Sequence, residues 1–215
     1  MSDGAQNLTD EYVLDTPRLR AFIEQTRAIQ QAERDPRAVT AAIRPHFADL
    51  LADKSWLPAR YQEPAVGSGM GSGIGQWLLY RAGDGSLALS ALVVPPGAAT
   101  PVHDHLAWGL VGLYRGTQDE EVFVREDDAS VEGAARLRVA ERRSLTPGDF
   151  YELFPETDIH RVRSTSDVTS VSLHLLGIDN GCIWRHRFFP DEQRVEPFRS
   201  GYVNQPCDDP AGANG

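Results

Sequence analysis

The sequence has no long hydrophobic run. Its longest mostly apolar stretch, Leu87 to Val94, is far shorter than the roughly 20 residues that a bilayer-spanning helix needs. The acidic start, Met1 to Glu11, lacks the positively charged and then apolar pattern of a secretory signal. We therefore expect a cytoplasmic protein that has no membrane partner.

Positive charge and cysteine are also scarce. There are 21 Lys and Arg residues against 31 Asp and Glu residues, which gives a formal net charge of −10. A chain of this charge repels phosphate backbones, so nucleic acid is not an expected partner. The two cysteines, Cys182 and Cys207, cannot make a disulfide framework, and neither belongs to a Cys-x-x-Cys pair. We therefore expect no structural disulfide.

What the sequence does contain is typical of one soluble domain. Its 215 residues are 41% hydrophobic and 24% charged, which is enough apolar material to bury a core. Residues 1–15 are polar and are expected to be disordered. Thr16-Pro17 and Asp35-Pro36 are each followed by apolar residues every three or four positions, so they predict the starts of two amphipathic helices.

The remainder of the chain is typical of antiparallel β-structure. Short runs rich in Leu, Val, Tyr, Phe and Ser are separated by Gly, Pro and Asp turns, which predicts a sandwich or barrel. The glycines between 67 and 75 do not have the spacing of a nucleotide-binding loop, and we interpret them as a flexible loop or lid. The expected strands are 76–80, 86–94, 109–114, 121–124, 135–141 and 168–176.

Three histidines form the candidate metal site. Alternate residues of a strand share a face, so His103 and His105 are expected to project together, and a third ligand, His160, is expected from another strand. A surface histidine pair is the alternative. No carboxylate follows the second histidine closely, so the donor set would be three neutral imidazoles. Such a set leaves coordination positions open for substrate and O₂, which favours iron oxygen chemistry over a closed zinc site.

Several spaced motifs resemble known families. Gly97, His103-x-His105 and Gly116 are similar in spacing to the first cupin motif, and Pro147-Gly148 with His160 is similar to the second. Across residues 16–205 the chain resembles the cysteine dioxygenase type I family, closest to its bacterial 3-mercaptopropionate dioxygenase branch. The segments that carry this resemblance are Trp56-Leu57-Pro58, Thr100-Pro101-Val102-His103-Asp104-His105-x-x-Trp108-Gly109, Ser172-Leu173-His174, Arg185-His186 and Ser200-Gly201-Tyr202-x-Asn204.

The resemblance implies a fold and a reaction. The fold would be an all-β cupin, a double-stranded β-helix or jelly-roll barrel, with an N-terminal helical element, followed by a disordered tail at 206–215. The reaction would be oxidation of a small thiol to a sulfinic acid by both atoms of O₂ at Fe(II). His103, His105 and His160 would occupy the iron-ligand positions.

The resemblance also assigns residues around the metal. Ser172 and His174 match the first two members of the family's catalytic Ser-x-His-x-Tyr triad, but Leu176 stands at the tyrosine position. Gly109 stands where the animal-type enzyme has the cysteine that cross-links to this tyrosine, so no thioether is expected. The missing phenol predicts a different thiol substrate.

Substrate recognition is expected to depend on a carboxylate. The resemblance to the 3-mercaptopropionate branch assigns Gln76 and Arg185 to carboxylate contacts, because guanidinium binds a carboxylate with two parallel hydrogen bonds. Arg81 and Arg187 are nearby rivals. Trp108 and Leu176 are expected to contact the substrate as well, and a barrel-filling side chain is the alternative for Trp108.

The substrate expected first is 3-mercaptopropionate, with cysteine and mercaptosuccinate as alternatives. A zinc-dependent hydrolase or isomerase and a non-catalytic ligand-binding cupin are the rival functions. The remaining candidate residues are interpreted as structural: His46 and His186 as surface or packing residues, and Glu120 and Glu121 as part of a solvated turn.

Overall fold

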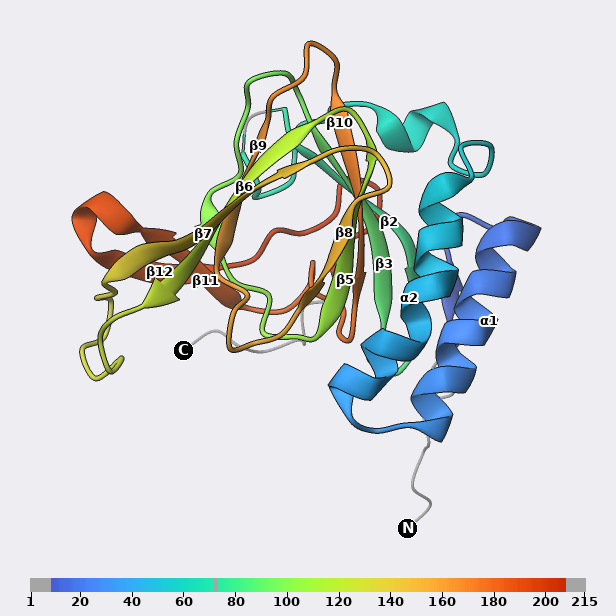
Figure 1. Cartoon of the computed structure of the whole chain (residues 1–215), viewed down its shortest axis with the longest axis horizontal. Coiled ribbons are helices and arrows are strands. Elements are labelled where there is room, and N and C mark those ends of the chain that lie inside the picture. Colours follow the sequence, from blue (N-terminus) through green and yellow to red (C-terminus); the bar gives the residue numbers. More distant parts are fainter. Residues whose placement is uncertain (1–8, 72, 208–215) are drawn as a thin grey trace.

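The computed structural model describes residues 9–71 and 73–207. Within these residues the chain forms two six-stranded antiparallel sheets that face each other, with two α-helices packed against the outside of one sheet (Figure 1). The helices are α1 (Pro17–Ala32) and α2 (Pro36–Ala52). Each begins at the expected proline, and the preceding Thr16 and Asp35 side chains accept hydrogen bonds from the backbone N–H groups of Leu19 and Arg37.

The helix-covered sheet is called here the first sheet. Its central strands, β3 and β10, are buried along their whole length because one face meets the other sheet and the other face meets the helices. Its strands, in spatial order, are β1 (Glu11–Tyr12), β2 (Gly75–Arg81), β3 (Ala88–Val94), β10 (Ser170–Leu176), β5 (Gly109–Arg115) and β8 (Phe150–Leu153).

The other sheet, called the second sheet, has its outer face open to solvent. Its strands β6 and β9 alternate between buried and more exposed residues, as expected when only one face is covered. Its strands, in spatial order, are β12 (Arg194–Phe198), β11 (Arg185–Phe189), β4 (Val102–His103), β9 (His160–Ser164), β6 (Gln118–Arg125) and β7 (Leu137–Leu145). Two short 3₁₀ helices complete the described elements, η1 (Ala59–Gln62) and η2 (Pro190–Glu192).

A glycine allows α2 to pack closely on the first sheet. A Cβ atom at Gly112 in β5 would lie 2.4 Å from Leu51 Cδ1 and 2.8 Å from Phe47 Cε1, both on α2. Phe47 is fully buried and its ring meets that of Phe150 edge to face at 5.7 Å. The helices are therefore an integral part of the core of the first sheet.

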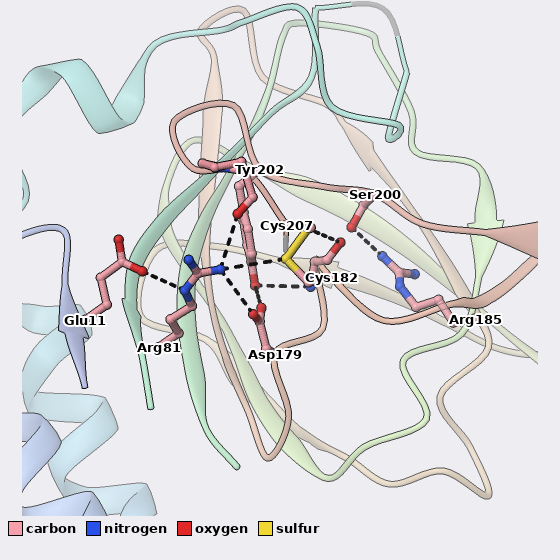
Figure 2. Close-up of a disulfide and its surroundings, with 10 residues drawn as sticks. Glu11, Arg81, Asp179, Cys182, Arg185, Ser200, Tyr202 and Cys207 are labelled. Atoms are coloured by element: carbon pink, nitrogen blue, oxygen red, sulfur yellow. Dashed lines mark hydrogen bonds and ion pairs between the residues drawn. A yellow bond between two sulfur atoms is a disulfide. The ribbon is translucent and has the colours of Figure 1, made fainter. Parts of the chain in front are cut away.

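The two ends of the chain differ from the sequence-based expectations. Strand β1 pairs with β2 and lies inside 1–15, where disorder is expected; residues 1–8 lie outside the described residues. The expectation of no structural disulfide is wrong, because Cys182 and Cys207 are joined with a Cα–Cα distance of 5.2 Å (Figure 2). Cys207 therefore lies in an anchored part of the segment 206–215, of which residues 208–215 lie outside the described residues.

Tertiary structure explains the disulfide. After β12 the chain returns to β2, where the Asn204 side chain bonds both backbone groups of Leu78, with the amide accepting from its N–H and donating to its carbonyl at 2.9 Å each. Val203 also donates its backbone N–H to the Gln76 carbonyl at 2.9 Å. This return brings together two cysteines that are 25 residues apart. None of the helices in the described residues has the length and apolar character required to cross a membrane.

Candidate metal centre and substrate pocket

The three predicted metal ligands meet inside the barrel. His103 and His160 lie directly opposite each other on the paired strands β4 and β9, and His105 follows just beyond the end of β4. All three side chains are buried, and one ring nitrogen from each lies within 4.8 Å of the others. The structure thus brings together residues that the sequence separates, in the arrangement that a three-histidine site needs.

His105 reaches this site through a turn rather than through the regular strand expected from the His-x-His spacing. Strand β4 ends at His103, and Leu106 adopts a left-handed conformation with φ of 58°. The carboxylate of Asp158 accepts hydrogen bonds from the backbone N–H groups of His105 at 2.8 Å and Leu106 at 2.7 Å. Burial raises the pKa of Asp158 to about 6, although these two hydrogen bonds favour its charged form.

The environment of the histidines fits a metal ion. Burial, together with the nearby His160, lowers the pKa of His103 and of His105 well below the usual value, which favours the neutral imidazoles that bind metals. The Nδ1 atom of His103 lies 2.9 Å from the Pro101 carbonyl, a contact that leaves Nε2 with its lone pair. The Nε2 atom of His160 is buried and has no hydrogen-bond partner in the described residues. An unpartnered buried ring nitrogen is the feature that a metal ion would satisfy.

The first sheet contributes a second group of polar residues. Ser172 and His174 are buried on β10, and the serine Oγ lies 3.0 Å from His174 Nε2. Burial lowers the pKa of His174 to about 3, so its ring is neutral at ordinary pH. The ring stacks toward His105 with a centroid distance of 6.3 Å. These two predicted residues therefore lie beside the metal ligands.

Leu176 and Gly109 form a matched pair. They are direct cross-strand neighbours on β10 and β5, and a Cβ atom at Gly109 would lie 2.4 Å from Leu176 Cδ2. The leucine side chain fills the space that any larger residue at position 109 would need. A larger residue at position 109 would therefore require a smaller or displaced side chain at position 176.

One small pocket contains most of the predicted substrate residues. Gln76 and Arg185 line it together with Leu176, His174 and two of the candidate metal ligands, His103 and His105. The full lining consists of Met70, Gln76, Ser90, Leu92, His103, His105, His174, Leu176, Asn180 and Arg185. Met70, Ser90, Leu92 and Asn180 are not among the residues predicted from the sequence, because no local motif marks them.

Arg185 is a buried cation that has no carboxylate within ion-pairing distance in the described part of the chain. It donates a hydrogen bond to the Ser200 hydroxyl at 2.9 Å (Figure 2). It also donates one to the Asp104 carbonyl at 2.6 Å, and its Nε has no hydrogen-bond partner in the described residues. Burial lowers its pKa to about 10, which still leaves it charged near neutral pH. An unneutralised buried charge is costly, so this site favours an anion.

The rival arginines are neutralised elsewhere. Arg81 forms ion pairs with Glu11 and Asp179 near the disulfide (Figure 2), and Arg187 pairs with Glu196. Neither arginine lines the pocket with Arg185.

Trp108 also lies outside this pocket. It is partly buried against the core of the first sheet, and its indole ring covers Gly177, where a Cβ atom would lie 2.3 Å from Trp108 Nε1. It borders a separate hollow beside α1. Its position after the histidine motif therefore does not place it in the substrate pocket.

The structure corrects the expectation that Glu120 lies in a solvated turn. It is a buried residue of β6 rather than part of a solvated turn, and its carboxylate lies 2.5 Å from His160 Nδ1. The alternation of Gln118, Glu120 and Val122 on the inward face is the signal that could have identified it. By contrast, Glu121 faces outward and pairs with Arg142 and Arg161.

Comparisons with known proteins give a family match and several similar solved structures. Residues 73–178 match the family model for cysteine dioxygenase type I. Among similar solved structures are a Cupin 2 conserved barrel domain protein from Salinispora arenicola CNS-205, with 16% identity over 53% of this chain and 82% of that chain and a TM-score of 0.37, and a double-stranded β-helix domain protein from Klebsiella pneumoniae, with 11% identity over 60% and 94% and a TM-score of 0.42. A recombinant oxalate oxidase in complex with glycolate is also similar, with 13% identity over 60% and 61% and a TM-score of 0.42.

The predicted fold class, a mostly β cupin barrel with N-terminal helices, is confirmed.

Proposed function

We propose that this protein is a thiol dioxygenase that oxidises a small mercapto-carboxylic acid to its sulfinic acid. The observation that carries the proposal is one pocket lined by metal-ligand histidines and by a buried arginine without a counter-ion. The family match over residues 73–178 supports the same reaction class. The pocket offers a place for the thiol next to the histidines and a place for the carboxylate at Arg185.

The reaction balances without another reductant. A thiol and O₂ combine to give a sulfinic acid, so sulfur loses four electrons and the two oxygen atoms gain them. Fe(II), which His103, His105 and His160 would hold, would supply the redox chemistry, and a soft thiolate is a suitable partner for it.

The protein's own residues would bind and orient the substrate. Arg185 would hold the carboxylate, and the fixed geometry of its guanidinium would restrict the direction from which the thiol approaches. The buried Gln76 side chain lies in the same pocket, and its Oε1 atom has no hydrogen-bond partner. His174, held by Ser172, would place a neutral polar ring beside the reacting atoms.

The charges of the pocket favour 3-mercaptopropionate over the two alternatives. No carboxylate is among its lining residues, so the ammonium group of cysteine would be buried without a counter-ion. Arg185 is the single arginine or lysine in the lining, so the second carboxylate of mercaptosuccinate would have no cation to pair with. A mercapto-monocarboxylate matches the one charge that the pocket presents.

Oxygen uptake by anaerobically iron-loaded protein tests the proposal. We expect 3-mercaptopropionate to accelerate uptake more strongly than cysteine, mercaptosuccinate or a thiol without a carboxylate, with one sulfinate formed for each O₂ consumed. Arg185→Lys keeps the charge but removes the paired donors, so it should raise KM for 3-mercaptopropionate. Arg187→Lys, at an arginine outside the pocket, is the matched control and should leave KM unchanged.

Other outcomes would identify the rival functions. If no thiol raises oxygen uptake above the buffer rate, the dioxygenase proposal fails, and the zinc enzyme or a binding protein without turnover replaces it. Equal KM values for Arg185→Lys and the wild type would instead overturn the assignment of the carboxylate site. The cytoplasmic location remains a prediction, and the disulfide is a feature more common in oxidising compartments.

A further inference from the structure

The surroundings of the three histidines are not equivalent. The Nδ1 atom of His103 lies 2.9 Å from the Pro101 carbonyl, and that of His105 lies 3.4 Å from the Asp158 carbonyl. The Nδ1 atom of His160 instead lies 2.5 Å from the Glu120 carboxylate. Of the three candidate ligands, His160 is therefore the one whose outer nitrogen meets a charged acceptor.

Glu120 is placed for this contact by β6. Its side chain is on the inward face, is about 1% exposed, and approaches His160 from the neighbouring strand β9. Its Oε1 atom accepts the hydrogen bond from His160, whereas its buried Oε2 atom has no hydrogen-bond partner in the described residues. A buried carboxylate is costly unless it is paired, so its position calls for a compensating positive charge.

On the side of Glu120 that faces away from the histidines, its negative charge is only partly compensated. Arg143, opposite Glu120 on β7, brings its Nη1 atom to 3.5 Å from Oε2, which is an ion pair without a hydrogen bond. Arg143 is partly exposed and also pairs with Glu141, so its charge is shared. Tyr151 of β8 places its hydroxyl 3.4 Å from His160 Nδ1 and supplies no charge. A metal ion bound by the three histidines on the inner side would supply the remaining positive charge.

We propose that Glu120 is a positioning residue that orients His160 and supplies negative charge to an otherwise neutral three-histidine metal site. This inference rests on the proposed metal site. A carboxylate that accepts the Nδ1–H fixes the tautomer with Nε2 free, and it makes that nitrogen a stronger donor. Arg143 opposes this effect from the other side of the carboxylate. Glu120 and Arg143 together would thus determine how strongly His160 Nε2 donates to the metal.

The decisive experiment measures metal binding and potential rather than thiol oxidation. Glu120→Gln preserves the shape and an accepting oxygen but removes the charge. We expect the apparent affinity for Co(II), measured by competition with a chromophoric chelator, to fall about 10- to 100-fold. The Fe(III)/Fe(II) reduction potential should rise, because removing a negative charge near the metal destabilises the more positive ferric state. Glu120→Asp should restore part of both properties.

Two further variants make the test specific. Glu121→Gln removes the same charge from the adjacent residue of β6, but that side chain faces outward, so affinity and potential should match those of the wild type. Arg143→Gln should shift both properties in the direction opposite to Glu120→Gln, with tighter Co(II) binding and a lower potential. A purely structural role for Glu120 does not predict opposite signs.

The outcomes separate this inference from the proposed function. Equal affinity and potential in Glu120→Gln and Glu121→Gln would overturn the role of Glu120. If Glu120→Gln does not fold, Arg143→Gln carries the test, and an unchanged or like-signed shift there overturns the inference. A wild-type protein that shows these metal-binding effects but oxidises no thiol would retain the role of Glu120 and lose the dioxygenase proposal.

Discussion

The two sheets face the same interior but have different outer surroundings. The first sheet is covered by α1 and α2, and its strands β3 and β10 are buried throughout. The second sheet carries a network of charged pairs on its outer face, such as Glu121 with Arg161. The three candidate metal ligands come from strands β4 and β9 of the second sheet and from the turn after β4. Ser172, His174 and Gln76 come from the first sheet.

The two sheets therefore contribute differently to stability and to the metal site. The first sheet gains most of its stability from apolar packing under the helices, and it presents neutral groups to the pocket. The second sheet has less apolar cover, and its interior holds the histidines together with Glu120. Changes in the first sheet should therefore affect mainly stability, and changes in the second should affect mainly the metal site.

The largest expected effect is loss of the metal. His105→Ala removes one of three donors, so we expect stoichiometric iron binding to disappear while the fold is retained. The measurement is metal content by mass spectrometry after anaerobic loading and gel filtration. His186→Ala, at a half-exposed histidine of the same sheet that contacts Asp104, is the control and should retain iron. A His105→Ala protein that keeps one iron per chain would refute the ligand assignment.

The next effect concerns the interface between α2 and the first sheet. Phe47→Ala leaves a cavity beside Phe150 and Gly112, and it should lower the free energy of unfolding by about 3–5 kcal/mol. Arg142→Ala, on the exposed face of the second sheet, should change it by less than about 0.5 kcal/mol. Urea denaturation measures both values. Similar values for the two variants would remove the stability contrast between the sheets.

The disulfide should have an intermediate effect. It joins two cysteines that are 25 residues apart. The segment between them starts in the loop before β11, includes β12, and ends after the residues that lie beside β2. Loop-closure entropy gives a loss of about 3.5 kcal/mol for Cys207→Ser. Unfolding of the wild type with and without a reducing agent provides the check, and reduction should have no effect on Cys207→Ser. An unchanged midpoint in the reduced wild type would show that this closure contributes little.

The smallest effect is at the junction of α1 with the turn between β2 and β3. Hydrogen bonds from Ser86, with Arg27 contributing, lower the pKa of Asp84 to about 2. A lowered pKa means that the charged carboxylate stabilises the fold above pH 4, and that this contribution is lost as the pH falls toward 2. Because Asp84 is 51% exposed, Asp84→Asn should cost less than about 0.5 kcal/mol at pH 7. The difference from wild type should shrink in acid, which urea unfolding at pH 7 and pH 3 would show.

Local patterns determined much of this protein. The Thr16-Pro17 and Asp35-Pro36 starts predict both helices correctly, because a cap and a 3.6-residue apolar repeat act within a few residues. The turn-punctuated apolar runs indicate the antiparallel barrel for the same reason. The His-x-His motif identifies two neighbouring candidate ligands because their separation along the chain is short.

Only the tertiary structure decided which distant groups meet. Strand pairing joins β6 to β9, and thereby places Glu120 against His160; the return along β2 likewise joins Cys182 to Cys207. The tertiary structure also leaves Arg185 buried without a carboxylate partner among the described residues. Strand register and the path of the C-terminal segment beside β2 depend on the packing of the whole domain, and burial determines how strongly charges interact. Local sequence patterns contain neither the strand pairing nor the burial.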